Sequence, residues 1–261
     1  MEIIQADSIS VFDRGLLYGD GFFTTAQVKD GRILLWQLHK ERLKNCQQRL
    51  YFPEIDWPRL ENACQRTSQD MSHGVLKIMI TRGKGGRGYL PPKNALQSVI
   101  IQTSDYPVHY KALQQSGLQL QFSAIKLGHQ PLLAGLKTLN RLEQVLIKED
   151  ASNYECDDVI VCDLDEHVIE TSVGNLIAIK NGKAFTPKLD RCGIEGVYLQ
   201  HLSTVNSIEK TRFSKQMLSE VDALFVCNSL LESVFVRSVG EHKFNLPLAQ
   251  MLKTQLESGM L

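Results

Sequence analysis

Apolar residues in the first hundred positions follow helical spacing in two stretches and strand-like patterns elsewhere. Helical spacing predicts one helix over 38–50 and a second from Trp57 to about Met71, where Pro58 suits a first helical turn. An Asp-Gly pair at 30–31 predicts a tight turn. Apolar runs rich in β-formers predict strands at 22–28, 33–35, 75–81 and 98–103.

The remaining chain alternates strand patterns with helical ones. Residues 106–117 are more polar, and we expect a linker there between a domain of residues 1–105 and one of residues 118–261. Asn181-Gly182 predicts a type I′ hairpin. Helices are expected at 195–206, at 214–220 and from Leu246 onward, and strands at 118–126, 158–162, 167–170, 175–180, 183–186, 223–227 and 233–239. This mixture indicates an α/β or α+β chain with two domains.

Composition narrows the class of protein. The 261 residues carry 29 basic and 29 acidic side chains, and this balance argues against a nucleic-acid-binding protein. Apolar runs are shorter than a membrane span, and the N-terminus lacks the basic region of a secretory signal. Six scattered cysteines form no C-x-x-C pair, which is typical of reduced thiols in the cytoplasm. We therefore expect a cytoplasmic protein without nucleic-acid or membrane partners.

One lysine stands out by its surroundings. Lys137 lies between apolar residues just before a predicted helix that Asn140 would cap, with Glu143 completing a capping box. An apolar stripe follows on that helix at Leu142, Val145 and Leu146. A lysine shielded from water in this way is a usable nucleophile and can hold a carbonyl cofactor as a Schiff base. The alternative is an ordinary solvated lysine.

Further polar residues are candidates for an anion site. Arg42 lies on the inward stripe of the first helix, where it would bind a phosphate or else a core carboxylate. Gly193 to Tyr198 opens a predicted helix whose N–H groups can hold an anion, and Asn228-Ser229 can add a hydroxyl and an N–H. Glu170 ends a strand, where it would face a pyridine nitrogen or simply be solvated.

The glycine-rich stretch 82–89 is a further candidate. It lacks the Gly-Lys-Ser/Thr ending of a phosphate-binding P-loop. Arg82 and Arg87 are candidates for binding substrate carboxylates, and the alternative is a flexible surface loop with solvated charges. From these residues alone we expect a two-domain α/β protein with candidate residues for binding an anion.

Taken together and in order, these motifs resemble the fold-type IV pyridoxal-phosphate (PLP) enzymes. The resemblance spans nearly the whole chain and rests on Asp13-Arg14-Gly15, Tyr18-Gly19-Asp20-Gly21, His39-x-x-Arg42-Leu43, Lys137, Glu170 to Asn175 and Gly196-Val197. It implies a two-domain, mixed α/β fold like that of D-amino acid aminotransferases, PLP as cofactor, and a homodimer.

The resemblance also implies roles. Lys137 would bind PLP covalently and move protons, and Thr24 is a second candidate to donate a proton to the leaving group. The other residues expected to hold the cofactor are Arg42 for its phosphate, Glu170 for its ring nitrogen, and Asn175, Val197, Tyr198, Asn228 and Ser229. Those expected to bind substrate are Arg82, Arg87, Tyr89 and Thr25, with Arg87 able to serve a partner's site.

Within this family, three stretches are similar to the lyase branch that acts on 4-amino-4-deoxychorismate: residues 19–25, 81–89 and 136–145. Aminotransferases usually carry Glu where this chain has Thr24. Gly174 departs from the family, where Ser or Ala is commoner. The expected activity is release of 4-aminobenzoate and pyruvate, a step of folate biosynthesis. The alternatives are a D-amino acid or branched-chain aminotransferase, and a non-catalytic anion-binding protein of this fold.

Overall fold

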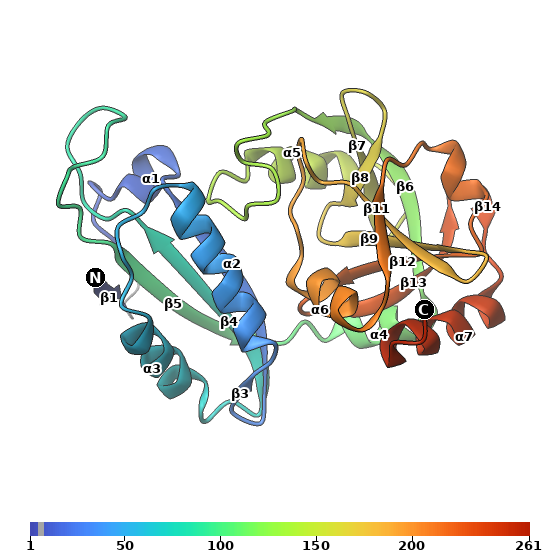
Figure 1. The fold of residues 1–261 in the computed structure, drawn as a ribbon, viewed down its shortest axis with the longest axis horizontal. Coiled ribbons are helices and arrows are strands. Elements are labelled where there is room, and N and C mark those ends of the chain that lie inside the picture. Colours follow the sequence, from blue (N-terminus) through green and yellow to red (C-terminus); the bar gives the residue numbers. More distant parts are fainter. Residues whose placement is uncertain (5–7) are drawn as a thin grey trace. The chain divides into compact units, whose positions relative to one another are not determined.

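The structure is a computed structural model that describes residues 1–4 and 8–261. The chain forms two compact units, each with its own sheet and helices (Figure 1). The first unit comprises Met1–Tyr106 together with Leu136–Asn140, and the second comprises Pro107–Gly135 and Arg141–Leu261. Over the described residues, no helix combines the length and apolar character that a bilayer crossing requires.

The sheet of the first unit is mainly antiparallel. Its strand order is β1-β5-β4-β2-β3, with β1 at Glu2–Ile4, β2 at Gly21–Lys29, β3 at Arg32–Ile33, β4 at His73–Thr81 and β5 at Ser98–Asp105. β2 and β4 pair along their full lengths, from Gly21 opposite Thr81 to Lys29 opposite His73. The strands predicted at 22–28, 75–81 and 98–103 are confirmed, whereas only Ile33 of the predicted strand 33–35 is extended, because residues 34 and 35 form a turn before the helix that begins at Trp36.

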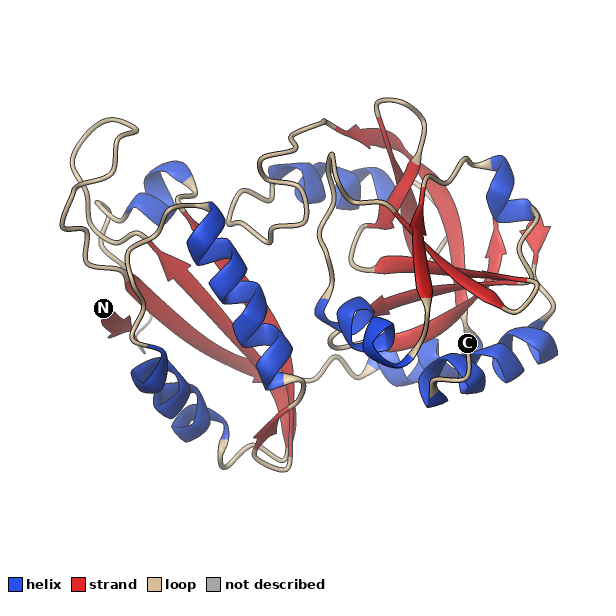
Figure 2. Cartoon of the chain, viewed as in Figure 1, coloured by secondary structure: helices blue, strands red, loops and turns tan. Residues whose placement is uncertain are grey.

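One face of this sheet carries the core of the first unit. The side chains of Phe22, Thr24, Ala26 and Val28 alternate along β2 and are fully buried. Helices α2 (Trp36–Arg49) and α3 (Trp57–Ser68) contribute buried residues such as Leu43 to the same core (Figure 2). Asp56 caps α3 by accepting from Arg59 N–H at 3.1 Å.

The Lys137 segment belongs to the first unit, which corrects the predicted domain division. The Phe23 N–H donates to the Lys137 carbonyl at 3.0 Å, and the Leu139 N–H donates to the Gly21 carbonyl at 2.9 Å. Residues 137–139 therefore pair with β2 like a short additional strand. The predicted linker is also corrected, because His109–Ser116 forms helix α4 within the second unit.

The second unit is built on a long curled sheet. Its order is β11-β10-β9-β12-β13-β6-β7-β8, with β14 paired to β13. The strands are β6 Leu118–Leu127, β7 Asp158–Asp163, β8 Val168–Thr171, β9 Asn175–Lys180, β10 Lys183–Pro187, β11 Ile208–Thr211, β12 Ala223–Asn228, β13 Glu232–Val239 and β14 His242–Lys243. The predicted hairpin is confirmed: β9 and β10 are antiparallel, and Asn181 and Gly182 both have positive φ, 51° and 71°.

Helices cover this sheet from outside. α6 (Val197–Val205) and α7 (Leu246–Ser258) share a core with β9, β12 and β13, whereas α5 (Leu142–Ala151) packs on β6 and β7 (Figure 2). The predicted short helix at 214–220 is a 3₁₀ turn, Gln216–Ser219. Asn245 caps α7 by accepting from Leu248 N–H at 3.1 Å.

The predicted capping box before α5 is wrong. Arg141 is the N-cap and makes no side-chain cap bond, while the Asn140 amide donates to the Gly19 carbonyl at 3.1 Å. Glu143 accepts instead from Gly128 N–H at 3.4 Å. The apolar stripe is exposed, with 71% of Leu142 and 61% of Val145 accessible. The start of α5 is therefore set by tertiary contacts, and the predicted stripe is not core, whereas Ile147 of the same helix is buried.

Candidate active site

The Lys137 amine lies against an aromatic ring of β2. Lys137 is half-buried, and its Nζ is 4.7 Å from the centroid of the Phe23 ring. Lys77, on the neighbouring strand β4, brings its own Nζ to 5.3 Å from the same centroid. Thr25, expected to bind substrate, is the register partner of Lys77 and shares this face with Phe23. Two amines and a hydroxyl-bearing residue thus mark one face of the sheet.

Thr24 points to the opposite face, which corrects the expectation that it donates a proton beside Lys137. Successive side chains of a strand alternate between faces, so Thr24 lies away from Phe23. Its hydroxyl is 2.6 Å from His39 Nδ1 on α2, and both residues are fully buried. The Thr24 hydroxyl therefore serves the packing of α2 on β2.

His39 is a buried neutral base. Burial, with a smaller effect of the Arg42 guanidinium, lowers the pKa of His39 from 6.5 to about 3. Its Nε2 is buried and has no hydrogen-bond partner among the described residues. Arg42 follows one helical turn later and is itself only 8% exposed. The buried Arg42 guanidinium, one helical turn from the buried His39 imidazole, is therefore suited to bind a phosphate group.

Arg82 is held by contacts within the first unit, and its role in substrate binding stays a prediction. Its Nε donates to both oxygens of Asp20 at 2.9 and 3.0 Å, and its two terminal nitrogens donate to the carbonyls of Leu50 and Tyr51, each at 2.9 Å. Its guanidinium also stacks 4.0 Å from the centroid of the Phe52 ring. Each of the three guanidinium nitrogens of Arg82 therefore has a partner within the first unit, and three of its five N–H groups make these bonds.

Arg87 and Tyr89 are placed differently from Arg82. Both are exposed on the loop that follows β4, and 86% of Tyr89 is accessible. The Tyr89 ring meets Tyr18 edge-on with centroids 5.6 Å apart. Their position leaves both side chains accessible to a ligand, so their role in substrate binding stays a prediction.

In the second unit, Glu170 and Asn175 hold the loop that precedes α6. The buried Glu170 carboxylate accepts from the Ile194 N–H at 2.9 Å, and the buried Asn175 amide donates to the Ile194 carbonyl at 2.8 Å. A side chain at Gly193, where φ is +85°, would clash with Ile169 and Leu189. The two polar side chains hold the two peptide groups that flank the Cα atom of Ile194.

The N-terminus of α6 is open for an anion. Gly196 is its N-cap, and no side chain among the described residues caps the first turn, which begins with Val197 and Tyr198. A Cβ at Gly196 would lie 2.1 Å from Asn175 Oδ1, so only glycine permits this close approach. Uncapped N–H groups at the positive end of a helix dipole fit a phosphate.

Asn228 is committed to its own turn. Its Oδ1 accepts from the Leu230 and Leu231 N–H groups at 2.8 and 2.7 Å, and its amide donates to the Val173 carbonyl at 3.2 Å. The Asn228 side chain therefore holds its own turn, and the place of Asn228 in the cofactor site stays a prediction. Ser229, the next residue, is half-buried, and its role stays a prediction.

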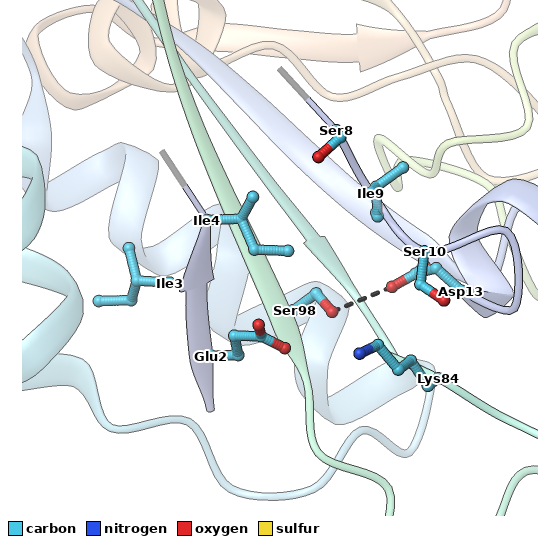
Figure 3. A pocket seen from close by; sticks show the side chains of 9 residues that line it. All are labelled: Glu2, Ile3, Ile4, Ser8, Ile9, Ser10, Asp13, Lys84 and Ser98. Carbon is cyan, nitrogen blue, oxygen red and sulfur yellow. Dashed lines mark hydrogen bonds between the residues drawn. The ribbon is translucent and has the colours of Figure 1, made fainter. Parts of the chain in front are cut away.

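A pocket of about 560 Å³ opens in the first unit beside β1 and β5. Figure 3 shows Asp13 at its wall, accepting from Ser98 Oγ. Asp13 is fully buried and also accepts from Thr81 Oγ1 at 2.9 Å and the Gly15 N–H at 2.8 Å. The described residues that line this pocket include none of those predicted to bind cofactor or substrate. Asp13 therefore joins α1 (Arg14–Tyr18) to the sheet.

Comparison with known proteins establishes the family. The sequence model of the family Amino-transferase class IV matches residues 21–239. This chain belongs to the class IV aminotransferase family. An aminodeoxychorismate lyase of Vibrio harveyi is 39% identical over 249 residues, which cover 92% of each protein.

Solved structures agree with this membership. The crystal structure of a 4-amino-4-deoxychorismate lyase from Pseudomonas aeruginosa has a TM-score of 0.89 at 33% identity and covers 98% of this chain and 97% of that one. A branched-chain amino acid aminotransferase from Escherichia coli has a TM-score of 0.84 at 19% identity, covering 97% of this chain and 88% of its own, which shows the shared fold. The predicted family and fold are confirmed.

Class IV aminotransferases use pyridoxal phosphate, and this chain has groups that fit it. Within the first unit, the Lys137 amine suits the aldehyde of the cofactor and the buried Arg42 suits its phosphate. Within the second unit, the open N-terminus of α6 by itself suits a phosphate. Sequence reasoning assigned no role to His39, Asp20 or Lys77. For the first two, the signal was present in the motifs His39-x-x-Arg42 and Gly19-Asp20-Gly21.

Proposed function

We propose that this chain is a PLP-dependent lyase that converts 4-amino-4-deoxychorismate into 4-aminobenzoate and pyruvate. The observation that carries the proposal is similarity above 30% to proteins named for this activity, over at least 92% of each compared chain. The named aminotransferases among the relatives are less similar, for example D-alanine aminotransferase of Staphylococcus epidermidis at 23% identity.

Lys137 carries the proton transfers in this proposal. The cofactor, when bound, supplies an electron sink for the charge that develops at the substrate ring. The Lys137 amine removes the proton at C4 of the substrate, because it lies on an ordered segment held to β2 by two backbone hydrogen bonds. The enolpyruvyl oxygen leaves C3, and proton delivery to the leaving group gives pyruvate. Loss of H4 and of this group makes the ring aromatic, so atoms balance without water.

The other residues bind and orient. We assign Arg42 and the backbone of Val197 and Tyr198 to the cofactor phosphate, and Glu170 to its ring nitrogen. Asn175 acts through the loop that it fixes at Ile194. Thr25 and the exposed Arg87, with Tyr89, are the proposed contacts to the substrate.

We also propose a homodimer in the cytoplasm. Large apolar side chains are exposed on α1 and on α5, including 63% of Leu16 and 71% of Leu142. Such surfaces are typical of contacts with another chain. All six cysteines lie in the described part of the chain, and none forms a disulfide. Light scattering on the purified protein measures the oligomeric state, and a monomer at micromolar concentration would contradict the dimer.

The decisive experiment incubates purified holoenzyme with 4-amino-4-deoxychorismate and follows 4-aminobenzoate and pyruvate together. We expect equimolar products, lost in Lys137→Ala. Lys29→Ala, which removes an exposed amine at the end of β2, is the matched control and keeps full activity.

Two outcomes would redirect the assignment. Bound cofactor without product, together with D-alanine-dependent transfer to a keto acid, would indicate an aminotransferase. Purified protein that binds no PLP, as judged by cofactor absorbance and by borohydride trapping on Lys137, would indicate a non-catalytic member of the fold.

A further inference from the structure

We propose that Arg14 is a positioning residue that fixes the loop bearing Arg87 and Tyr89 in its binding conformation. This inference rests on the proposed function, in which that loop contacts the substrate. Arg14 lies in α1, and only 2% of it is exposed. It thus acts on a ligand only through the residues that it holds.

Arg14 grips the backbone of the loop at two consecutive carbonyls. One terminal nitrogen donates to the Gly88 carbonyl at 2.9 Å, and the other donates to the Tyr89 carbonyl at 2.7 Å. The Gly88 N–H in turn donates to the Tyr18 hydroxyl at 3.1 Å. The planar guanidinium fork fits two neighbouring carbonyls, which a lysine ammonium cannot reproduce. The buried Arg14 and its neighbour Tyr18 therefore hold the backbone of a loop whose side chains are exposed.

A shared carboxylate fixes Arg14 itself. Its Nε donates to Asp20 at 2.8 Å, and the same Asp20 accepts from Arg82. Arg82 is anchored in turn at the carbonyls that follow α2. The Arg14 stem also fills the space beside Gly85, where a Cβ would lie 2.6 Å from Arg14 Cδ. The loop conformation is therefore coupled, through Asp20, to the body of the first unit.

The contacts of the Arg14 guanidinium indicate that it does not bind the substrate itself. All three guanidinium nitrogens have partners within the unit, and the ring of Tyr18 lies 4.8 Å from its central carbon. By contrast, Arg87 is exposed on the loop that Arg14 holds. Removing the fork should displace Arg87 and Tyr89 while the proton-transferring Lys137 stays in place.

The test compares Arg14→Lys with the wild-type holoenzyme. We expect KM for 4-amino-4-deoxychorismate to rise roughly tenfold, while kcat changes less than about twofold, because a displaced loop weakens binding but not the chemistry at Lys137. Arg59→Lys is the matched control, since Arg59 also donates to a backbone carbonyl, that of Met1, at 3.1 Å, but on an exposed surface. A variant that loses kcat and stability at constant KM would overturn the proposal.

A double-mutant cycle identifies the route of the effect. In an Arg87→Ala/Tyr89→Ala background, Arg14→Lys should raise KM less than about twofold further, because the side chains that it positions are gone. Effects that multiply would show that Arg14 acts elsewhere. Tyr18→Phe, which removes only the acceptor of Gly88 N–H, should shift KM in the same direction by a smaller factor and guards against misfolding of the lysine variant.

Limited proteolysis separates this proposal from the proposed function. Trypsin cleaves after Lys84 and Arg87, both exposed on the loop, and a held loop resists cleavage. We expect Arg14→Lys to be cut there at least fivefold faster than wild type, with Arg59→Lys unchanged. Unchanged cleavage would refute the proposal that Arg14 holds this loop, even if the lyase is active. Faster cleavage in a protein without lyase activity would support the contact between Arg14 and the loop but contradict the proposed function.

Discussion

Replacement of Arg82 should unfold the first unit more easily instead of weakening substrate binding. Arg82→Met removes two hydrogen bonds to the carbonyls of Leu50 and Tyr51 and one arm of the pair with Asp20. The side chain of Arg82 is 8% exposed and that of Asp20 17%, so water replaces these contacts poorly. Methionine keeps most of the apolar stem that packs near Phe52.

The size of the effect follows from these contacts. Breaking a buried ion pair costs about 3–5 kcal/mol when the remaining charge is left alone. Asp20 keeps its bond from Arg14 at 2.8 Å, so we take the lower end, about 3 kcal/mol. Arg82→Lys keeps the charge but reaches fewer of the three acceptors, and we expect about half that loss.

Urea unfolding followed by tryptophan fluorescence measures this directly. Both tryptophans, Trp36 and Trp57, lie in the first unit, so the signal reports that unit. With a slope of about 2 kcal/mol per molar urea, the midpoint should fall by about 1.5 M for Arg82→Met. An unchanged midpoint combined with a raised KM would refute the reasoning and return Arg82 to the substrate site.

Three further outcomes follow from the site. Between pH 7 and pH 5 the first unit should lose about 2 kcal/mol of its unfolding free energy. The pKa of His39 is 6.5 in the unfolded chain and about 3 in the folded one, so the unfolded chain takes up more protons as the pH falls. Urea titrations at both pH values measure this loss, and His39→Gln should flatten the pH dependence. Arg42→Ala should raise the Kd for PLP roughly 30-fold in a cofactor titration, and equal affinity would remove its assigned role. Glu170→Gln keeps an acceptor for the Ile194 N–H at 2.9 Å, so the fold should persist while proton removal slows at least tenfold; an unchanged rate, or unchanged deuterium isotope effect at C4, would contradict its pairing with the cofactor ring.

The sequence predicted β2 but not which of its residues face the reaction. Residues 22–25 read Phe-Phe-Thr-Thr, so each face of the strand receives one phenylalanine and one threonine. Because apolar and polar residues do not alternate in this stretch, the sequence does not show which face of the strand belongs to the core. The choice is made by α2, whose His39 bonds to Thr24, and by Lys137, which lies over Phe23. Long-range packing therefore decides a question that the local pattern leaves open.

The two arginines of the glycine-rich stretch show a second limit. Arg82 and Arg87 are five positions apart and chemically identical, yet one is buried in the unit and the other is exposed. The difference comes from Asp20, which lies 62 positions before Arg82 in the chain. Local composition makes both arginines candidates for binding an anion, but only the fold shows that one of the two guanidinium groups is buried among partners within the unit.

Lys137 shows how a reactive side chain can be positioned without a local signal. The sequence suggested a helix cap at Asn140, yet the segment is held by backbone hydrogen bonds to Gly21 and Phe23. Backbone bonds of this kind are open to almost any residue, so they leave no trace in composition or spacing. Because the segment is continuous with β2, the amine is placed by the sheet and not by the start of α5. Substitutions at Asn140 should therefore disturb the reaction less than a proline at Leu139, which would remove the N–H donated to Gly21.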